Sequence, residues 1–361
     1  MWAERGVDRE HGGFVERLTL NAEPDMAAAK RVRVQARQLY VFAHADVMGL
    51  YPGASQLASH GYRFLRDHAL PDGTDAGLVH SLHRDGRVVD PRRDTYDHAF
   101  VLFALSWYVR ASGDTEARAL IRALAEASWK LLGHPGGAGL MVDDRGTLEL
   151  HQNPHMHLFE AMLAAFDATA DTWFLERADE LFTLFRDRMF DRQHQVLREF
   201  YDADWRPVAD ERGTIVEPGH HCEWVWLLKR FADRKGETLC PEAFALFNFV
   251  ENFGRRDGGS LLCDQLRPDG SVLKSDTRSW PQTEAIKADV AMAEVYGTVP
   301  GARTDAIVTA LFERFLDSAP NGGWIDWTNA TGTPLVTTMP ASTFYHLFLA
   351  FSEYLGAHDI T

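Results

Sequence analysis

The sequence predicts an all-α fold, an (α/α)6 barrel with short β-hairpins in its connecting loops. From Tyr96 onward, helices that are apolar on nearly every side recur at intervals of roughly 60 residues, and each of the first four is followed by a helix with one polar face. Helices that are apolar all round must be covered on every side, whereas helices with one polar face can cover them and meet water. Two concentric layers of helices satisfy both requirements.

The bulk composition is that of a globular protein with no nucleic-acid partner. The chain has 361 residues, of which 45% are hydrophobic and 25% charged, and its formal net charge is −15. Nucleic-acid binding needs a basic stripe, which this balance argues against. The longest uncharged apolar run, Ala99–Val109, is too short to span a membrane. We expect a single catalytic domain over residues 1–361, although length alone would also allow two domains.

Cysteine usage favours the cytoplasm. The cysteines are Cys222, Cys240 and Cys263, and a low, odd count does not form a disulfide framework. The sequence shows no secretory leader. Both observations indicate a reducing, cytoplasmic location.

Six helices are expected in the inner layer and five in the outer layer. The inner helices begin near Ala27, Tyr96, Asn153, Glu217, Trp280 and Ser342. The outer helices are Ala54–Leu70, Thr115–Leu132, Trp173–Met189, Leu239–Phe253 and Arg303–Asp317. In the third of these, Phe174, Ala178 and Leu181 share one side, while charged residues hold the other.

A closed ring of six helix pairs needs one more helix than this count provides. We expect the missing first helix to precede Met1, because the sequence starts abruptly. The surface it leaves bare would be covered by flanking residues or by a second copy of the chain in a homodimer. An open helical solenoid is the alternative, but helices that are apolar on every side fit a closed ring better.

The connectors between helix pairs carry hairpin signals rich in Asp and Gly. Leu78–Leu82 and Arg87–Val89 flank an Arg-Asp-Gly turn, and Leu261–Lys274 is centred on a Pro-Asp-Gly turn. A similar pattern occurs at Leu140–Gly146. Each is expected to form a short β-hairpin in a connecting loop.

The later inner helices share polar first turns. These turns are Tyr96-Asp97-His98, the run Asn153 to Glu160, the run Glu217 to Trp224, the run Trp280 to Glu284, and the run Ser342 to His346. If the helices point the same way around a ring, these starts gather at one end of its axis. Asn153 and His157 are four residues apart, and His220 and Glu223 are three apart, so each pair shares a helix face. Three histidines converging with carboxylates predict an active site there.

Several of these residues also have a purely structural interpretation. Asp97 and His98 could cap their helix, since Asp is favoured at that position. His155 and His221 point away from the faces of their neighbouring histidines, and we interpret both as structural. Arg37 could be a satisfied core arginine, although an inner helix is a costly place for a cation without a carboxylate partner.

No metal or cofactor is predicted. His151, His155 and His157 could ligate zinc, but no His-Glu-x-x-His motif or nearby cysteine pair accompanies them. The sequence also lacks a Gly-x-Ser-x-Gly elbow and a glycine-rich phosphate loop.

At its polar helix starts the chain resembles the N-acylglucosamine 2-epimerase superfamily, which also holds mannose isomerases, sulfoquinovose isomerases and cellobiose 2-epimerases. The motifs that carry the resemblance are Arg33 to Gln38, Tyr96 to Phe100, Asn153 to His157, Pro218 to Trp224, Trp280 to Ala285 and Phe344 to His346. They span nearly the whole chain in the right order. The resemblance implies an (α/α)6 barrel and a monosaccharide substrate.

The resemblance also implies roles for individual residues. His220 and His346 would be the two acid/base residues, and His157 would assist opening of the sugar ring. Arg37 would hold the sugar oxygen that becomes negative, and Glu223 would orient or polarise the site. The residues implied to bind substrate are Tyr96, Asn153, Met156, Trp280 and Gln282. Histidine suits proton transfer next to a carbonyl because its pKa lies near the working pH, and this route needs no metal or redox cofactor.

The product depends on where the proton returns. Two bases on opposite faces of C2 would invert that carbon, whereas one base delivering to C1 would give a ketose. Pro340 to His346 looks closer to the mannose-isomerase-like members, so we expect interconversion of D-mannose and D-fructose. The alternatives are 2-epimerisation of N-acylglucosamine or glucose, and isomerisation of a 6-phospho or 6-sulfo sugar. The last would use Arg84, Arg87, Arg92 and Arg93, although arginine runs are usually solvated loops.

Two other functional classes remain open. A glycosidase or lyase on the same barrel would need two carboxylates for acid/base work, and Glu223 and Glu284 are candidates. A glycosidase or lyase would leave the three convergent histidines without a role. The second alternative class is a binding protein that kept the fold and lost the reaction, and the retained histidines argue against it.

Overall fold

The structure, a computed structural model, describes residues 1–147, 149–255 and 259–359. Its internal contacts divide the chain into two compact units. Unit 1 comprises Met1–Leu184 with Pro340–Tyr345, and unit 2 comprises Phe185–Met339 with His346–Thr361. A single catalytic domain over residues 1–361 stays a prediction.

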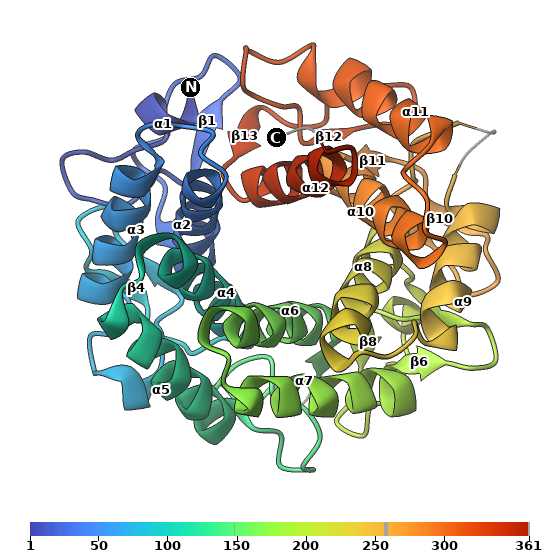
Figure 1. The fold of residues 1–361 in the computed structure, drawn as a ribbon, viewed down its shortest axis with the longest axis horizontal. Helices are drawn as coiled ribbons and strands as arrows, with labels where there is room; N and C mark the ends of the chain where they lie inside the picture. Colours follow the sequence, from blue (N-terminus) through green and yellow to red (C-terminus); the bar gives the residue numbers. More distant parts are fainter. Residues whose placement is uncertain (148, 256–258, 360–361) are drawn as a thin grey trace. The chain divides into compact units, whose positions relative to one another are not determined.

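Unit 1 is built from paired helices. They are α1 (Trp2–Arg5), α2 (Val32–Val47), α3 (Ala54–His68), α4 (Thr95–Ser112), α5 (Thr115–Leu132), α6 (Gln152–Thr169) and α7 (Thr172–Leu184). Helix α4 packs between α2 and α6, and α3, α5 and α7 pack on α2, α4 and α6 respectively (Figure 1). Nearly all of α4 is buried, whereas α5 buries one side. The predicted alternation of inner and outer helices is confirmed within this unit.

Unit 2 repeats the pattern. Its helices are α8 (Pro218–Lys235), α9 (Pro241–Phe249), α10 (Ser279–Val295), α11 (Ala302–Leu311) and most of α12 (Thr343–Ala357). Helix α8 packs against α10, while α9 packs on α8 and α11 on α10 (Figure 1). Nearly all of α10 is buried, including its polar residues Glu284, Lys287 and Asp289.

The helix boundaries depart from prediction at identifiable places. Helix α2 begins at Val32 rather than Ala27, because Lys30–Arg31 form strand β2. Helix α9 begins at Pro241, since proline fixes φ and lacks the N–H that a first helical position leaves unused. Three outer helices end in a wider π-helical turn, at Phe185–Met189, Val250–Gly254 and Phe312–Leu316.

Two of the three predicted hairpins are present. Strand β3 (Ser81–Leu82) pairs with β4 (Val88–Asp90), and β9 (Gln265–Leu266) pairs with β10 (Val272–Lys274), both antiparallel. The prediction of a hairpin at Leu140–Gly146 is wrong. Leu140 instead bridges Gly133, and Asp143 bridges Asp94 at the start of α4, so this segment ties loops to helices.

The remaining strands are short. They are β1 (Arg17–Thr19), β5 (Leu150–His151), β6 (Phe190–Asp191), β7 (Val196–Leu197), β8 (Phe200–Tyr201), β11 (Thr277–Arg278), β12 (Trp327–Thr328) and β13 (Thr338–Pro340). In unit 2, β6 pairs with β7 and β11 with β12, both antiparallel. Across the described ranges no helix has the length and apolarity needed to cross a membrane.

Candidate active site

The first turn of α8 places His220 beside Trp280. Pro218 occupies the first helical position, where its missing N–H costs nothing. Gly219 follows, and a Cβ added there would lie 2.7 Å from the Trp280 ring. Glycine therefore lets the indole of α10 approach this turn. The imidazole of His220 lies 4.8 Å from the Trp280 ring, measured between centroids.

Three carboxylates act on His220. Its Nδ1 lies 3.0 Å from both oxygens of Glu199 and 3.5 Å from Glu217. Burial alone would lower the pKa of His220, but these two carboxylates and Glu223 outweigh burial and raise the pKa to about 9. At neutral pH His220 is therefore an imidazolium that can donate a proton.

The second histidine of unit 2 faces a carboxylate that is already paired. His346 Nδ1 lies 2.8 Å from Glu284 Oε1, and Lys287 Nζ lies 2.6 Å from Glu284 Oε2. Glu284 and Lys287 are both completely buried. Burial would raise the pKa of Glu284, but Lys287 and His346 hold it below its usual range. The lysine therefore offsets the negative charge that faces His346.

Trp280 and Glu223 lie close to these two histidines and complete the proposed proton-transfer group, which comprises His220, His346, Trp280, Glu223 and Glu284. The Trp280 ring lies 5.6 Å from His346 between centroids, so both histidines flank the same indole. One ligand atom each from Glu223, Glu284 and His346 lies within 4.8 Å of the others. Such a group could surround a cation, and the ammonium of Lys287 already supplies one to Glu284.

The geometry of unit 2 suits proton transfer. His220 and His346 each direct Nδ1 to a carboxylate, which places Nε2 on the opposite side of the ring. A carboxylate behind a histidine fixes the ring and its tautomer, as in acid/base enzymes of several folds. Two such histidines beside one aromatic ring can serve as an acid and a base for one small molecule.

In unit 1, α2 carries a buried cation. Arg37 is 6% exposed, and one Nη donates a hydrogen bond to the Tyr96 hydroxyl at 2.7 Å. The guanidinium carbon lies 4.0 Å from the Phe100 ring centroid and 5.3 Å from that of Tyr345. Its Nε is buried without a hydrogen-bond partner, and no carboxylate in the described ranges of this unit pairs with it. A cation held by aromatic faces can offer its charge to a ligand oxygen.

His157 lies close to this arginine's aromatic neighbours. Its Nδ1 lies 3.1 Å from Glu160 Oε2, one turn later in α6. The Tyr345 hydroxyl donates to the same carboxylate at 2.6 Å. The His157 ring lies 4.5 Å from Phe100 and 5.0 Å from Tyr96, between centroids. Arg37, Tyr96 and His157 are thus gathered in unit 1.

The remaining implied substrate-binding residues of unit 1 differ in accessibility. Tyr96 and Asn153 both line a pocket of 290 Å³. Met156 is completely buried in α6. The first two can therefore meet a ligand in this unit, whereas Met156 shapes the packing behind them.

The two histidines interpreted as structural do hold loops to helices. His155 bonds the backbone of Leu140 and His151, and His221 bonds the backbone of Leu197. Burial lowers the pKa of both to about 4, so each is neutral at physiological pH. Since both nitrogens of His155 are engaged, it has none to offer a zinc ion.

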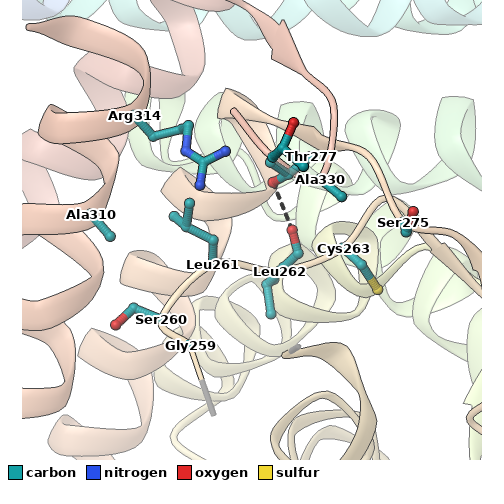
Figure 2. Close-up of a pocket in the computed structure, with 11 residues that line it drawn as sticks. Gly259, Ser260, Leu261, Leu262, Cys263, Ser275, Thr277, Ala310, Arg314 and Ala330 are labelled. Atoms are coloured by element: carbon teal, nitrogen blue, oxygen red, sulfur yellow. Dashed lines mark hydrogen bonds between the residues drawn. The ribbon is translucent and has the colours of Figure 1, made fainter. Parts of the chain in front are cut away.

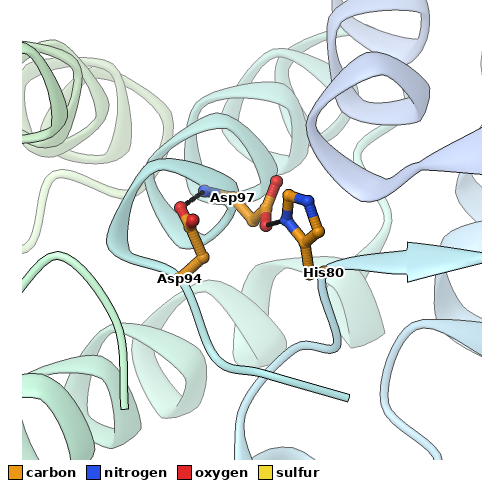
Figure 3. A group of neighbouring side chains, drawn as sticks. All are labelled: His80, Asp94 and Asp97. Atoms are coloured by element: carbon orange, nitrogen blue, oxygen red, sulfur yellow. Dashed lines mark hydrogen bonds and ion pairs between the residues drawn. The ribbon is translucent and has the colours of Figure 1, made fainter. Parts of the chain in front are cut away.

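A third cluster, His80, Asp94 and Asp97, serves the start of α4 (Figure 3). Asp94 caps the helix by accepting from two backbone N–H groups, which is the role considered above for Asp97. Asp97 instead accepts from Arg33 at 2.7 Å and lies 2.7 Å from His80 Nδ1. Burial would raise the pKa of Asp97, but Arg33 and His80 hold it below its usual range. Arginine therefore occupies the place that a metal would take.

Gln282 is engaged entirely by the protein. It is fully buried, its Oε1 accepts from the Leu262 N–H at 2.7 Å, and its Nε2 donates to Leu262 O, Thr277 Oγ1 and Arg278 O. An amide saturated in this way holds the loop to α10. We assign it a structural role rather than the substrate-binding role that the resemblance implies.

The arginines suggested for a 6-phosphate already have acidic partners. Arg84 pairs with Asp8 and Glu10, Arg87 with Asp85, Arg92 with Asp90, and Arg93 with Asp72. Each positive charge is thereby offset locally, which makes these arginines less suited to binding a phosphate group.

Sequence reasoning missed the partners of the histidines. Glu160 is three residues after His157, and Lys287 three after Glu284, so the helical spacing used for His220 and Glu223 could have found both. Glu199 has no such signal. It lies 21 residues before His220, outside α8, and only the fold brings it there.

Helix-borne histidines backed by carboxylates are suited to moving protons on a small molecule. The family model described as N-acylglucosamine 2-epimerase (GlcNAc 2-epimerase) matches residues 12–350. The chain belongs to this family.

Three relatives support that assignment. A mannose-6-phosphate isomerase from Rhizobium meliloti (strain 1021) is 37% identical and covers 98% of this chain and 92% of its own. A D-mannose isomerase from Thermobifida fusca is 34% identical, covering 73% and 69%. A cellobiose 2-epimerase from Ruminococcus albus (strain ATCC 27210 / DSM 20455 / JCM 14654 / NCDO 2250 / 7) is 29% identical, covering 77% and 74%. The protein is a sugar isomerase or 2-epimerase, as predicted.

The fold class is confirmed by a solved structure. A crystal structure of D-mannose isomerase matches with a TM-score of 0.85 and 23% identity, covering 98% of this chain and 94% of its own. That likeness shows the fold, an (α/α)6 barrel with small sheets. Because unrelated chemistries share such barrels, the reaction must be argued from the site.

Proposed function

We propose that the protein is an aldose–ketose isomerase that interconverts D-mannose and D-fructose, or a close relative, through an enediolate. The observation that carries the proposal is the unequal pair of histidines beside Trp280. His220 is held protonated by three carboxylates, whereas His346 faces a carboxylate whose charge Lys287 offsets. One is suited to be an acid and the other a base at the same pH.

In the proposed reaction His346 removes the C2 proton, the C–H electrons form the C1=C2 bond, and the carbonyl electrons move to the C1 oxygen, which gives the enediolate. That oxygen then takes a proton from His220, which gives the enediol. His220 then recovers the proton of the C2 hydroxyl, the electrons form the C2 carbonyl, and C1 takes the proton held by His346. The net change moves one hydrogen from C2 to C1 and one between the two oxygens.

Other residues act on the sugar in this proposal. Arg37 stabilises the oxygen that becomes negative, since a preorganised cation there favours the transition state. His157, held by Glu160, assists ring opening. Tyr96 and Asn153 contact sugar hydroxyl groups, and Trp280 offers its face to the ring. Glu223 helps to keep His220 protonated.

The residue roles are tested by substitution. His220→Asn and His346→Asn should each abolish ketose formation while circular dichroism shows an intact fold. His194→Asn, a histidine of unit 2 paired with Asp191 outside this group, is the matched control and should keep full activity. Near-wild-type turnover in either active-site variant would remove that histidine from the mechanism.

The role of His157 needs a different assay. His157→Asn should slow turnover of ring-closed mannose far more than turnover of an open-chain aldose. An equal loss with both substrates would rule out a ring-opening role.

Two alternative functions each have an observation in their favour. A 2-epimerase would use the same histidines, and the cellobiose 2-epimerase relative favours it. A 6-phospho sugar substrate is favoured by the mannose-6-phosphate isomerase relative, while the paired arginines weigh against it. Parallel assays of mannose, glucose and mannose 6-phosphate with product identification distinguish the three. Mannose should give fructose with an isomerase and glucose with a 2-epimerase, whereas an enzyme for 6-phospho sugars should show a high kcat/KM only with mannose 6-phosphate.

We further propose a cytoplasmic enzyme that forms a homodimer. Exposed Tyr296 and Val299, at 67% and 65%, give unit 2 apolar surface near the start of α11 that a second copy could cover. Sedimentation velocity should show a dimer, and a monomer at high protein concentration would contradict this.

A further inference from the structure

Unit 2 contains a cavity whose lining includes none of the proposed catalytic residues (Figure 2). Its volume is 410 Å³, which lies within the range of small-molecule sites. The loop that carries Ser260, the strand at Thr277, the π-helical turn that carries Arg314 and the loop at Thr331 form its walls. Arg314 is the one charged residue among the described residues that line it.

The guanidinium of Arg314 has an unmet hydrogen-bonding group. Its Nη1 is buried and has no hydrogen-bond partner, and the described chain provides no ion pair to Arg314. An unsatisfied buried N–H of this kind is unfavourable, so a site that retains one is suited to an external acceptor. Figure 2 shows the guanidinium reaching over Leu261 towards Thr277 and Ala330.

The opposite loop is shaped to let the guanidinium extend. Gly332 has a φ of +95°, which favours glycine, and a Cβ added there would lie 2.7 Å from Arg314 Nη1. The absent side chain therefore leaves room for the arginine. No carboxylate occurs among the described lining residues, so Arg314 supplies the charge of the described wall.

We propose that this cavity binds a small organic oxyanion, a molecule with a carboxylate or phosphate group and further polar atoms. The planar Arg314 guanidinium would hold the anionic group through paired hydrogen bonds. The polar side chains of Ser260 and Thr331 lie on the wall to meet the remaining oxygens. A single inorganic ion would fill only part of 410 Å³, which favours an organic anion.

The site is connected to the proposed reaction centre through one wall. Thr277 donates to Leu262 O at 2.7 Å, and the Gln282 amide bonds both residues. Gln282 lies on α10 between Trp280 and Glu284. An anion that orders this wall therefore acts on the segment that leads into the first turn of α10.

Isothermal titration calorimetry at low ionic strength tests the proposal, with citrate and inorganic phosphate as probes. Wild-type protein should bind citrate saturably and more tightly than phosphate. Arg314→Gln should weaken citrate binding at least tenfold. Ala330→Leu, which narrows the cavity and keeps the arginine, should weaken it as well. Arg206→Gln, an exposed arginine of the same unit that pairs with Asp204, should leave affinity unchanged.

Three results would overturn the proposal. The first is no saturable binding of either probe to the wild type. The second is equal affinity in the wild type and Arg314→Gln, which would place the anion elsewhere, including at the histidines. The third is equal weakening by Arg314→Gln and Arg206→Gln, which would indicate a general charge effect. Thermal unfolding of each variant checks that the fold is retained.

Discussion

At the scale of single residues, His220 and His346 differ in the charges that surround their partner carboxylates. Glu199, Glu217 and Glu223 together raise the pKa of His220 to about 9. Glu284 faces His346 but also pairs with the buried Lys287. The lysine touches no substrate in this account. It is a positioning residue that sets the charge next to the base.

Replacing Lys287 tests this role. Lys287→Met removes the ammonium and leaves Glu284 more negative, so His346 should hold its proton more tightly. The acid limb of the kcat/KM profile should move to higher pH, with kcat less affected at alkaline pH. The loss of one partner of a buried pair should also destabilise the fold by about 3 kcal/mol.

Lys130→Met, at an exposed position on α5, is the control for this experiment. It should change neither the pH profile nor stability. An unshifted acid limb in a folded Lys287→Met enzyme would reduce the lysine to a structural residue.

Glu199→Gln should act in the opposite direction. Without that carboxylate the pKa of His220 falls towards its usual value, so the alkaline limb of activity should move to lower pH. The effect on stability follows from linkage. Because the folded pKa of about 9 exceeds the unfolded value of about 6.5, the His220 contribution is full below about pH 6.5 and is lost as pH rises through 9.

Urea unfolding at several pH values measures that contribution. Wild type should exceed Glu199→Gln in stability at pH 6, and the gap should close by pH 10. A gap independent of pH would show that the Glu199 contact is not ionic.

At the scale of secondary-structure elements, close helix approach in unit 2 depends on Gly219. Gly219→Ala should push Trp280 away from its place beside His220, since the added Cβ would lie 2.7 Å from the ring. Displacement of the Trp280 ring should lower kcat/KM about 10- to 100-fold with little loss of helix content.

Gly356→Ala is the matched helical control, because its Cβ would meet nothing within 4 Å. It should be neutral or slightly stabilising. Equal activity in the two variants would mean that Trp280 does not position the sugar.

Buried neutral histidines tie loops to α6 and α8, and they should make the stability of the fold depend on pH in the acid range. The folded pKa values of His155 and His221, about 4, lie below the unfolded value of about 6.5. The unfolded chain binds more protons between these values, so stability should fall as pH drops from 6.5 towards 4. Urea unfolding should show this loss, and constant stability over that range would contradict it.

At the scale of the whole molecule, much of the architecture was predictable and the pairing of charges was not. The alternation of fully buried helices with helices that bury one side follows from the local periodicity of apolar residues, and α5 was predicted with its observed bounds. The positions of His157, His220 and His346 near helix starts are also local features, so the sequence could identify them. The partner Glu199 and the aromatic setting of Arg37 depend on long-range contacts that spacing does not encode.

The central claim is that this enzyme moves the C2 proton of an aldose through an enediolate by means of its two histidines. Proton NMR of the protein with D-mannose in deuterium oxide follows both the product and that proton. The account predicts fructose carrying deuterium at C1, with none formed by His346→Asn. Glucose labelled at C2 would identify a 2-epimerase instead. Fructose whose C1 never gains deuterium over a prolonged incubation would contradict proton transfer and point to a hydride shift.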